Sequence, residues 1–283
     1  MNKKQIVVGL VAVAIMGYLY SLPVKGLIKP KDTKTDKTTV MTANRKGAAN
    51  TVTVDMVSAT AKAAIGAALT AKINDLEGQL KNASGSDQQK LQQQLASQWD
   101  DVNQPAPAAF YYLALGRKEN KLQDWLNAGN RFNDAYKLTQ DTLTQPAFVT
   151  NAVEAFQSAL KLKPESLEGK TGLGIAYVNG GAGPMQGIAL LLDVVKQDPK
   201  NWNANLNLGM FAMKSGQFEK AVARFKTLLA QKQELEPSFY LAESYKQLGM
   251  KKEAIDAYQK CKEMMPDPVF GQRIDEYIKE LKN

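Results

Sequence analysis

A leucine followed by a small residue recurs about every 34 residues in the second half of the chain. Leu173-Gly174, Leu208-Gly209 and Leu241-Ala242 place the small residue first 35 and then 33 residues apart. A period of this length is typical of stacked helix pairs, in which each pair buries its apolar face against the next. The chain is therefore predicted to be all-α and to build much of its fold by repetition.

The last two units add a second pattern, which is a small residue followed four positions later by an aromatic one, whereas the first unit has its aromatic residue three positions after its glycine. Small residues let two helices approach closely, and the large rings fill the gaps between layers. The units are residues 167–201, with Leu173-Gly174-x2-Tyr177 and a long turn at 179–184; 202–234, with Leu208-Gly209 and Ala221-x3-Phe225; and 235–268, with Leu241-Ala242 and Ala254-x3-Tyr258.

This arrangement resembles the tetratricopeptide repeat (TPR), a 34-residue helix–turn–helix unit. The resemblance covers roughly residues 120–282. It implies an α-solenoid without enzymatic activity that binds a partner peptide or an amphipathic partner helix in a concave groove. Residues 269–283 follow the last repeat, and we expect them to form a C-terminal capping helix.

A fourth unit, residues 120–166, is degenerate and fits two registers. In one, Trp125-x2-Ala128-Gly129-x2-Phe132 is the first helix and Ala152-x3-Phe156 the second, with about 11 extra residues between them. In the other, Leu115-Gly116 belongs to the first helix and Ala128-x3-Phe132-x2-Ala135 to the second. The spacing alone allows both registers.

In TPR proteins the first helix of each repeat lines the groove, and the resemblance carries this rule onto nine positions here. Met residues suit adaptable binding surfaces because their side chains are flexible and polarizable. Asn207 fits one position of a carboxylate-binding subclass, but Met210 stands where that subclass has a second Asn. The predicted groove residues are Thr171, Ile175, Val178, Leu206, Met210, Met213, Phe239, Glu243 and Lys246.

Residues 53–119 precede the repeats and are predicted to form a helical hairpin and a connecting helix. Apolar residues at helical spacing, from Ile65 to Leu80, predict one helix over about 55–82. Ser86 and Gln89 have the spacing of a capping box, which predicts the start of the next helix. Leu91, Leu95 and Trp99 continue that helix as its apolar stripe.

The N-terminus predicts a membrane anchor. Residues 6–24 form an uncharged apolar run of 19 residues behind Lys3 and Lys4. As a helix the run would be about 28 Å long, close to the thickness of a bilayer core. Residues 1–24 are therefore expected to be an uncleaved signal-anchor helix, and residues 25–52 a flexible basic tether.

The layout is similar to that of membrane-anchored TPR proteins of bacterial envelopes, which assist the assembly or secretion of other proteins. We expect a single-pass inner-membrane protein with its C-terminal domain in the periplasm. The basic tether, which holds seven basic and two acidic residues in 25–50, favours the opposite, cytoplasmic orientation. Both orientations remain open at this stage.

Composition narrows the possible chemistry. The chain has no histidine and one cysteine, so histidine-dependent catalysis and histidine metal sites are excluded. The net charge of +8 gathers near the N-terminus and leaves residues 51–283 almost neutral, which argues against nucleic-acid binding. We expect no cofactor, metal or small-molecule substrate. The alternative is an enzyme with a carboxylate-based site in residues 53–119.

Overall fold

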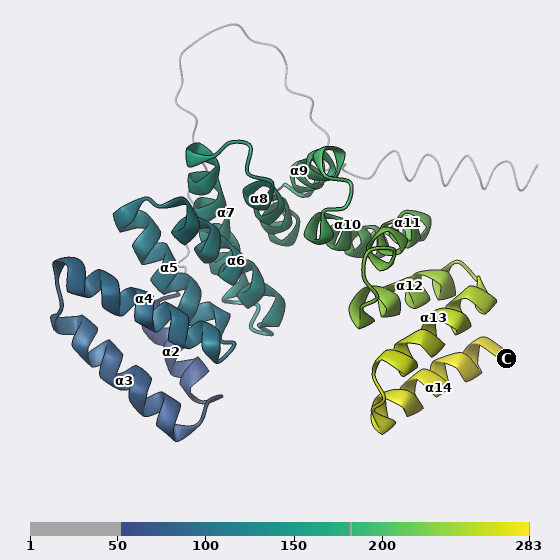
Figure 1. The fold of residues 1–283 in the computed structure, drawn as a ribbon, viewed down its shortest axis with the longest axis horizontal. Coiled ribbons are helices and arrows are strands. Elements are labelled where there is room, and N and C mark those ends of the chain that lie inside the picture. Colours follow the sequence, from purple (N-terminus) through teal and green to yellow (C-terminus); the bar gives the residue numbers. More distant parts are fainter. Residues whose placement is uncertain (1–51, 182, 283) are drawn as a thin grey trace, which may run out of the picture. The chain divides into compact units, whose positions relative to one another are not determined.

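The computed structural model describes residues 52–181 and 183–282. They contain thirteen α-helices and no β-strand (Figure 1). The helices are α2 (Val54–Lys62), α3 (Ala67–Asn82), α4 (Gly85–Asp101), α5 (Pro105–Glu119), α6 (Leu122–Leu138), α7 (Gln145–Leu162), α8 (Leu167–Gly180), α9 (Pro184–Gln197), α10 (Trp202–Lys214), α11 (Phe218–Leu229), α12 (Leu235–Gln247), α13 (Lys251–Met264) and α14 (Pro268–Lys282).

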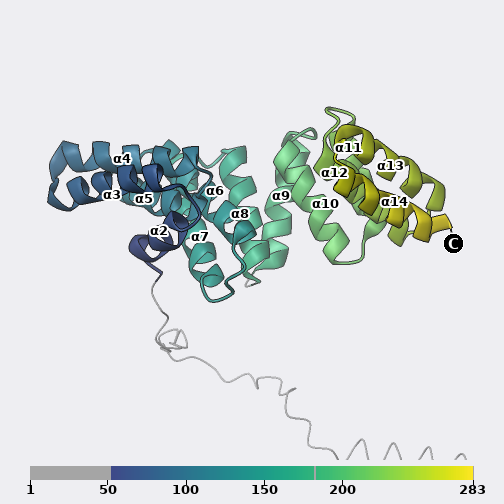
Figure 2. The same ribbon diagram turned by 90° about the horizontal axis from the view of Figure 1, so that it is seen from below.

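From α3 to α14, each helix packs against the next helix in the chain, as Figures 1 and 2 show. First helices of neighbouring repeats also touch, since α6 contacts α8 and α10 contacts both α8 and α12. Such contacts between sequential units define an α-solenoid. The predicted all-α, TPR-like solenoid is therefore confirmed for the described residues.

The small residues of the repeat pattern lie against aromatic rings, as the sequence predicted. A Cβ added to Gly209 on α10 would lie 2.6 Å from the ring of Phe225 on α11. A Cβ on Gly129 of α6 would lie equally close, at 2.6 Å, to the ring of Phe156 on α7. Both rings are fully buried. The glycines thus set the distance between the helices of a pair.

Glycine also ends two of the first helices. Gly216 follows α10 and Gly249 follows α12, each with a positive φ that side chains disfavour. Behind them, the amide of Gln217 donates to the carbonyl of Ala212, and that of Met250 donates to Tyr245. These bonds are those of a Schellman motif, which satisfies the last carbonyls of a helix and reverses the chain.

Helix α6 makes the close glycine–aromatic contacts expected in both of the registers that the sequence allowed. The Gly116 position on α5 meets the ring of Trp125 on α6, and Gly129 on α6 meets Phe156 on α7. Helix α6 nevertheless takes the place of a first helix, because it contacts α8, the first helix of the next repeat.

The repeat pattern extends upstream of residue 120. Ala96 on α4 and Ala108 on α5 are 12 residues apart, as are Gly209 and Ala221, and all four are buried. Tyr112 follows Ala108 by four positions, where the other units have an aromatic residue. The pair of α4 and α5 therefore packs like a repeat, and the boundary expected at 119/120 falls between two helices in close contact.

Two predictions for residues 53–119 were wrong in detail. The helix expected over 55–82 is broken between Lys62 and Ala67, because α2 folds back to pack on α5. As a result Leu69, part of the predicted apolar stripe, is 41% exposed. Helix α4 begins at Gly85, so Ser86 lies inside it and forms no capping box; its N-cap is Ser84.

The predicted membrane helix, residues 1–24, and nearly all of the tether, residues 25–52, lie outside the described residues. In the part of the chain that the structure describes, no helix combines the length and apolar character needed to cross a membrane.

Candidate functional site

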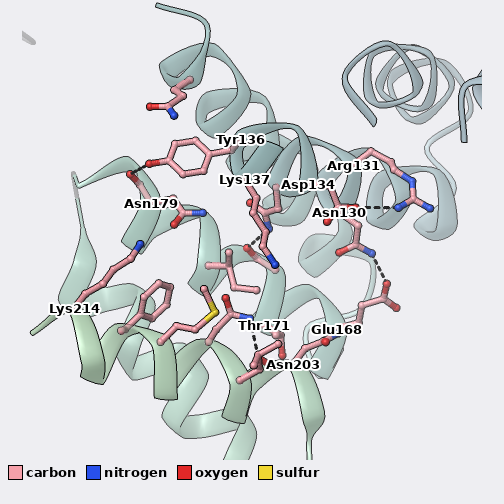
Figure 3. A pocket seen from close by; sticks show the side chains of 18 of the residues that line it. Asn130, Arg131, Asp134, Tyr136, Lys137, Glu168, Thr171, Asn179, Asn203 and Lys214 are labelled. Carbon is pink, nitrogen blue, oxygen red and sulfur yellow. Dashed lines mark hydrogen bonds and ion pairs between the residues drawn. The ribbon is translucent and has the colours of Figure 1, made fainter. Parts of the chain in front are cut away.

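A groove of about 800 Å³ lies along the first helices α6, α8 and α10 (Figure 3). Its volume falls in the range of about 300–1,000 Å³ that is usual for ligand sites. Each of the three helices contributes residues about one turn apart, because a helix presents one face through positions i, i+3 and i+4. The groove is therefore a product of the repeat, which sets first helices side by side.

Asparagines are the most frequent residue type in the groove. Asn130 and Asn133 come from α6, Asn179 from α8, and Asn203 and Asn207 from α10. An asparagine carries both a hydrogen-bond acceptor and two N–H donors. A row of them on three successive helices can therefore follow the alternating donors and acceptors of a peptide backbone.

Three of these side chains already use a donor within the protein. The amide group of Asn130 donates to Glu168 at 2.7 Å, that of Asn133 to the carbonyl of Gly172 at 3.0 Å, and that of Asn207 to the carbonyl of Asn203 at 2.8 Å. Figure 3 shows the bond between Asn130 and Glu168. These bonds orient the side chains and leave their Oδ1 acceptors for a ligand.

The charges of the groove are mostly satisfied within the protein. The guanidinium of Arg131 contacts Asp100 at 2.7 Å and Asp134 at 2.9 Å. The Nζ atom of Lys137 lies 3.3 Å from a carboxylate oxygen of Glu236, which reaches it from α12. Lys214, at the end of α10, is exposed, and its ammonium forms no ion pair with another described residue.

Four of the nine predicted groove residues line this groove, namely Thr171, Ile175, Leu206 and Met210. Thr171 is buried, and its hydroxyl donates to the carbonyl of Leu167 at 2.7 Å. Ile175, Leu206 and Met210 are apolar and line the same groove as the asparagines.

The other two predicted residues of α8 and α10 point elsewhere. Val178 packs towards α9, since a Cβ on Gly187 would lie 2.8 Å from it. Met213 packs against the apolar cluster that contains Phe225. Both positions lie between residues that line the groove, Ile175 and Asn179 on α8 and Met210 and Lys214 on α10. Their side chains leave the helix in a different direction, towards the neighbouring second helix.

The three predicted residues of α12 contact the capping helix and its neighbour. The ring of Phe239 lies 6.0 Å from that of Tyr258 and 6.3 Å from that of Tyr277, measured between centroids. Glu243 accepts a hydrogen bond from the Tyr258 hydroxyl. Lys246 lies over the Tyr277 ring and 3.3 Å from Glu280. Side chains of α13 and α14 therefore engage all three predicted groove residues of the last repeat.

The residues that sequence reasoning missed lie mostly on α6. Asn130, Asn133 and Lys137 are among them, together with Asn179 and Asn203 on the neighbouring helices. Helix α6 was overlooked because its repeat fits two registers and its groove face could not be assigned. The high density of asparagines in the first helices was a signal available in the sequence.

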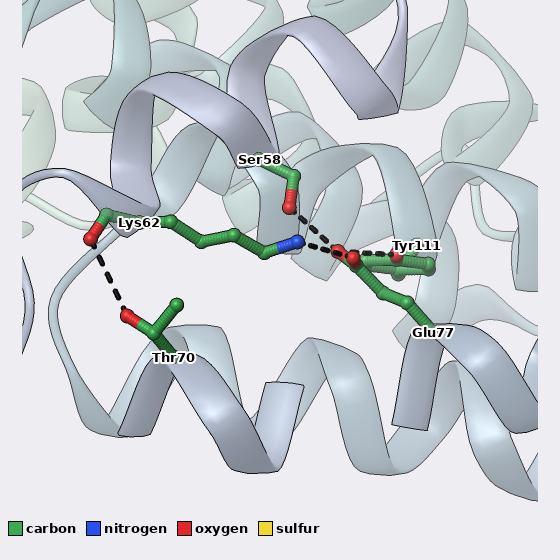
Figure 4. A network of polar contacts seen from close by, with 5 residues as sticks. All are labelled: Ser58, Lys62, Thr70, Glu77 and Tyr111. Carbon is green, nitrogen blue, oxygen red and sulfur yellow. Dashed lines mark hydrogen bonds and ion pairs between the residues drawn. The ribbon is translucent and has the colours of Figure 1, made fainter. Parts of the chain in front are cut away.

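One polar network lies outside the groove, in the N-terminal helices (Figure 4). Glu77 accepts hydrogen bonds from Ser58 at 2.5 Å, from Tyr111 at 3.5 Å and from the ammonium of Lys62. Burial raises the pKa of Tyr111, and the charge of Glu77 raises it further. The network joins α2, α3 and α5 through the single carboxylate of Glu77.

Among the described residues, no group of three or more His, Cys, Asp or Glu side chains is placed to hold a metal ion.

Two family models, both described as tetratricopeptide repeat, match residues 186–240 and 238–267. The chain therefore carries TPR repeats in this region, as predicted. No curated protein matches the sequence.

Solved structures with the same fold extend this finding beyond the matched residues. A thermophilic TPR protein of Thermus thermophilus is similar over 66% of this chain and 97% of its own, with 21% identity and a TM-score of 0.52. PilW, described as a widely conserved type IV pilus biogenesis factor, is similar over 69% of this chain and 86% of its own, with 22% identity and a TM-score of 0.52. At these identities the likeness establishes the TPR-type fold alone.

Proposed function

We propose that this protein is a membrane-tethered TPR adaptor that holds an extended segment of a partner protein in the groove of α6, α8 and α10. The observation that carries the proposal is the asparagine row, which runs across three successive first helices. TPR-type repeats are interaction scaffolds. In this chain the first helices α6, α8 and α10 line a groove that is large enough for a ligand.

An extended segment fits the groove better than a partner helix does. An extended backbone has unpaired N–H and C=O groups along its length, and these require partners when they are buried. The Oδ1 atoms of Asn130, Asn133 and Asn207 can accept from its N–H groups. The side chains of Asn203 and Lys214 can donate to its carbonyls. A helix, whose backbone bonds are internal, would use few of these groups.

The tether belongs to the proposal because of the sequence. The apolar run of residues 6–24 followed by the basic segment 25–50 would hold the repeats near a bilayer. In this arrangement the adaptor recruits its partner at the membrane face, on the periplasmic side of a bacterial inner membrane. Assisting the assembly or secretion of envelope proteins is the process that this layout favours, and no catalytic activity is assigned to the chain.

The groove is tested by photo-crosslinking in intact cells, with a photoreactive amino acid at Met210 of the full chain. Met210 lines the groove, and its replacement removes none of the hydrogen bonds described above. Glu219, exposed on α11 and outside the groove lining, is the matched control position. We expect one dominant protein adduct from Met210 and none from Glu219.

A second variant makes the result specific to the asparagines. The variant adds Asn203→Ala to the protein that carries the photoreactive amino acid at Met210. Asn203 is exposed, and its side-chain amide forms no hydrogen bond with another described residue. The variant should weaken the adduct without changing the melting temperature. Equal adducts from Met210 and Glu219, or an adduct indifferent to Asn203→Ala, would show that the groove does not bind the partner.

Orientation is tested separately with alkaline phosphatase fused after Asn283, since this enzyme is active only outside the cytoplasm. An active fusion is expected. A stable but inactive fusion would place the repeats on the cytoplasmic side, the orientation that the basic tether favours.

A further inference from the structure

A second hollow, of about 300 Å³, lies between α9 and α11, and it differs from the groove in character. Its floor is apolar and comes from α10, where Leu208, Phe211 and Ala212 are buried. Its walls are the exposed faces of Ile188 and Leu192 on α9 and of residues on α11. We refer to this hollow as the α9–α11 cleft.

Helix α9 exposes two neighbouring apolar side chains where it lines the cleft. Leu192 is 45% exposed, and Ile188, one turn earlier on the same face, is half-buried. Both side chains line the cleft beside Ala223 of α11, which is exposed. Apolar residues that gather at a concave place on the surface mark an interaction site more often than scattered ones do.

The rim of the α9–α11 cleft is cationic. Lys220 and Arg224 lie one turn apart on α11, and the residues that line the cleft include no Asp or Glu. Arg224 donates to the side chain of Asn205 at 3.1 Å and has no carboxylate partner among the described residues. The side chain of Arg224 is half-buried, and this burial lowers its pKa. A half-buried arginine of this kind is complementary to an incoming carboxylate.

We propose that the α9–α11 cleft is a second docking site, which takes an amphipathic helix of a partner protein whose apolar ridge is flanked by carboxylates. The apolar ridge would lie between Ile188, Leu192 and the α10 floor, and the carboxylates would face Lys220 and Arg224.

The shape and chemistry of the cleft favour a helix over an extended segment. The walls are two helices, and a third helix can pack its ridges into the channel between them. An extended segment would bring unpaired backbone groups against apolar walls, which costs free energy. A helix satisfies these groups internally and presents side chains alone.

The second site is independent of the proposed function and would extend it. The groove of α6, α8 and α10 is lined by asparagines and suits an extended backbone, whereas the α9–α11 cleft is apolar with a basic rim. Occupied together, the two sites would let one chain bridge two partner segments. Phe211 lines both hollows, so it is left unchanged in the test below.

The test uses two synthetic helical peptides with the same leucine ridge, one flanked by glutamates and the other by lysines. Fluorescence anisotropy measures their binding to the full-length protein. We expect the acidic peptide to bind at least about 10-fold more tightly than the basic one, as a complementary rim charge favours it. Leu192→Glu should weaken the acidic peptide by a similar factor, about 10-fold, because it places a charge in the apolar wall.

Four further variants separate binding from folding. Met185→Glu is the matched control, because Met185 is 75% exposed on the same helix and outside the cleft. Lys220→Glu and Arg224→Glu should each weaken the acidic peptide and strengthen the basic one, while thermal melting followed by circular dichroism stays unchanged for Lys220→Glu. Asn203→Ala, in the other groove, should leave both peptides unaffected.

The proposal is overturned by several results. One is that the two peptides bind equally, or that neither binds. Another is that Met185→Glu weakens the acidic peptide as much as Leu192→Glu does. A third is that Leu192→Glu changes the sedimentation coefficient of the protein alone, which would mean that a second copy of this chain covers the cleft. None of these outcomes depends on whether the groove of α6, α8 and α10 binds a partner.

Discussion

At the scale of single residues, the fold depends on glycines that have no room for a side chain. Gly172 on α8 is the tightest of them, since a Cβ there would lie 2.0 Å from the ring of Phe156 on α7. The same ring lies against Gly129 on α6, so one aromatic side chain fixes the distances among three helices. Phe156 is fully buried and cannot move aside without opening the core.

Gly172→Ala should therefore destabilise the protein by about 1–3 kcal/mol, because the added methyl group overpacks the core. Gly78→Ala is the matched control, since Gly78 lies within α3 and has nothing within 4 Å of an added Cβ. The control should stabilise the protein by about 0.5–1 kcal/mol through helix propensity. Urea unfolding measures both. A Gly172→Ala protein as stable as the wild type would contradict the packing described.

Tyr112 makes stability sensitive to alkaline pH. Burial, followed by the charge and hydrogen bond of Asp100, raises the pKa of Tyr112 from 10.0 to about 12. The hydroxyl donates to Asp100 at 2.9 Å. Because the folded state favours the neutral phenol, this stabilisation is complete below pH 10 and is lost as the pH rises from 10 to about 12.

Tyr112→Phe should cost about 0.5–1.5 kcal/mol at pH 8, where the hydrogen bond is intact. The variant should then lose less stability than the wild type between pH 10 and 12, because phenylalanine has no proton to release. Melting temperatures at several pH values measure the two slopes. Parallel slopes would mean that Tyr112 titrates normally in the folded protein.

At the scale of elements, the last helix closes the solenoid. Helix α14 packs against α13, and its Ile274, Ile278 and Leu281 are buried in one cluster with Tyr258 and Ala242. A terminal repeat otherwise exposes the apolar face that its missing neighbour would cover. The cap explains why Phe239, Glu243 and Lys246 of α12 are engaged with aromatic side chains and not with a groove.

Ile274→Ala should destabilise the cap by about 2–5 kcal/mol, because it leaves a cavity at a fully buried position. The comparison is Val269→Ala on the same helix, where the side chain is 67% exposed. That change should stay within about 0.5 kcal/mol of the wild type. Hydrogen exchange should show faster exchange in α13 and α14 for Ile274→Ala alone. Unchanged exchange there would show that α14 is not needed as a cap.

At the scale of the whole described unit, the core is uneven. One large apolar cluster runs from Val52 to Ala176 and joins α2 through α8, whereas the C-terminal repeats are divided among three smaller clusters. In solenoids each repeat contacts its neighbours alone, so local stability follows the local core. The C-terminal repeats should therefore open before the N-terminal helices.

Native-state hydrogen exchange in increasing denaturant measures this difference. Amides of α10–α14 should open with a free energy at least about 2 kcal/mol below that of α4–α7. Variants that weaken one cluster, such as Ile274→Ala, should lower the opening free energy of the C-terminal repeats alone. A single opening free energy for all helices would show that the unit unfolds as one.

The repeated helix pairs and their spacing could be predicted from the amino-acid sequence. Small residues and rings, such as Gly209 with Phe225, occur at fixed separations because packing within a pair is a local demand on the chain. The resemblance to TPR proteins predicted that the first helices line a groove, and Thr171, Ile175, Leu206 and Met210 are the predicted residues that line the one found here.

Which helix faces line the groove depends on contacts between helices. Helix α6 fits two registers in sequence, and its contact with α8 assigns Asn130 and Asn133 to the groove. The face of α12 has the pattern of a groove face, but side chains of α13 and α14 contact it. Helix α2 breaks from α3 because α5 offers it a surface. Such outcomes depend on contacts between residues far apart in the chain, and the spacing of residues within one helix carries no record of them.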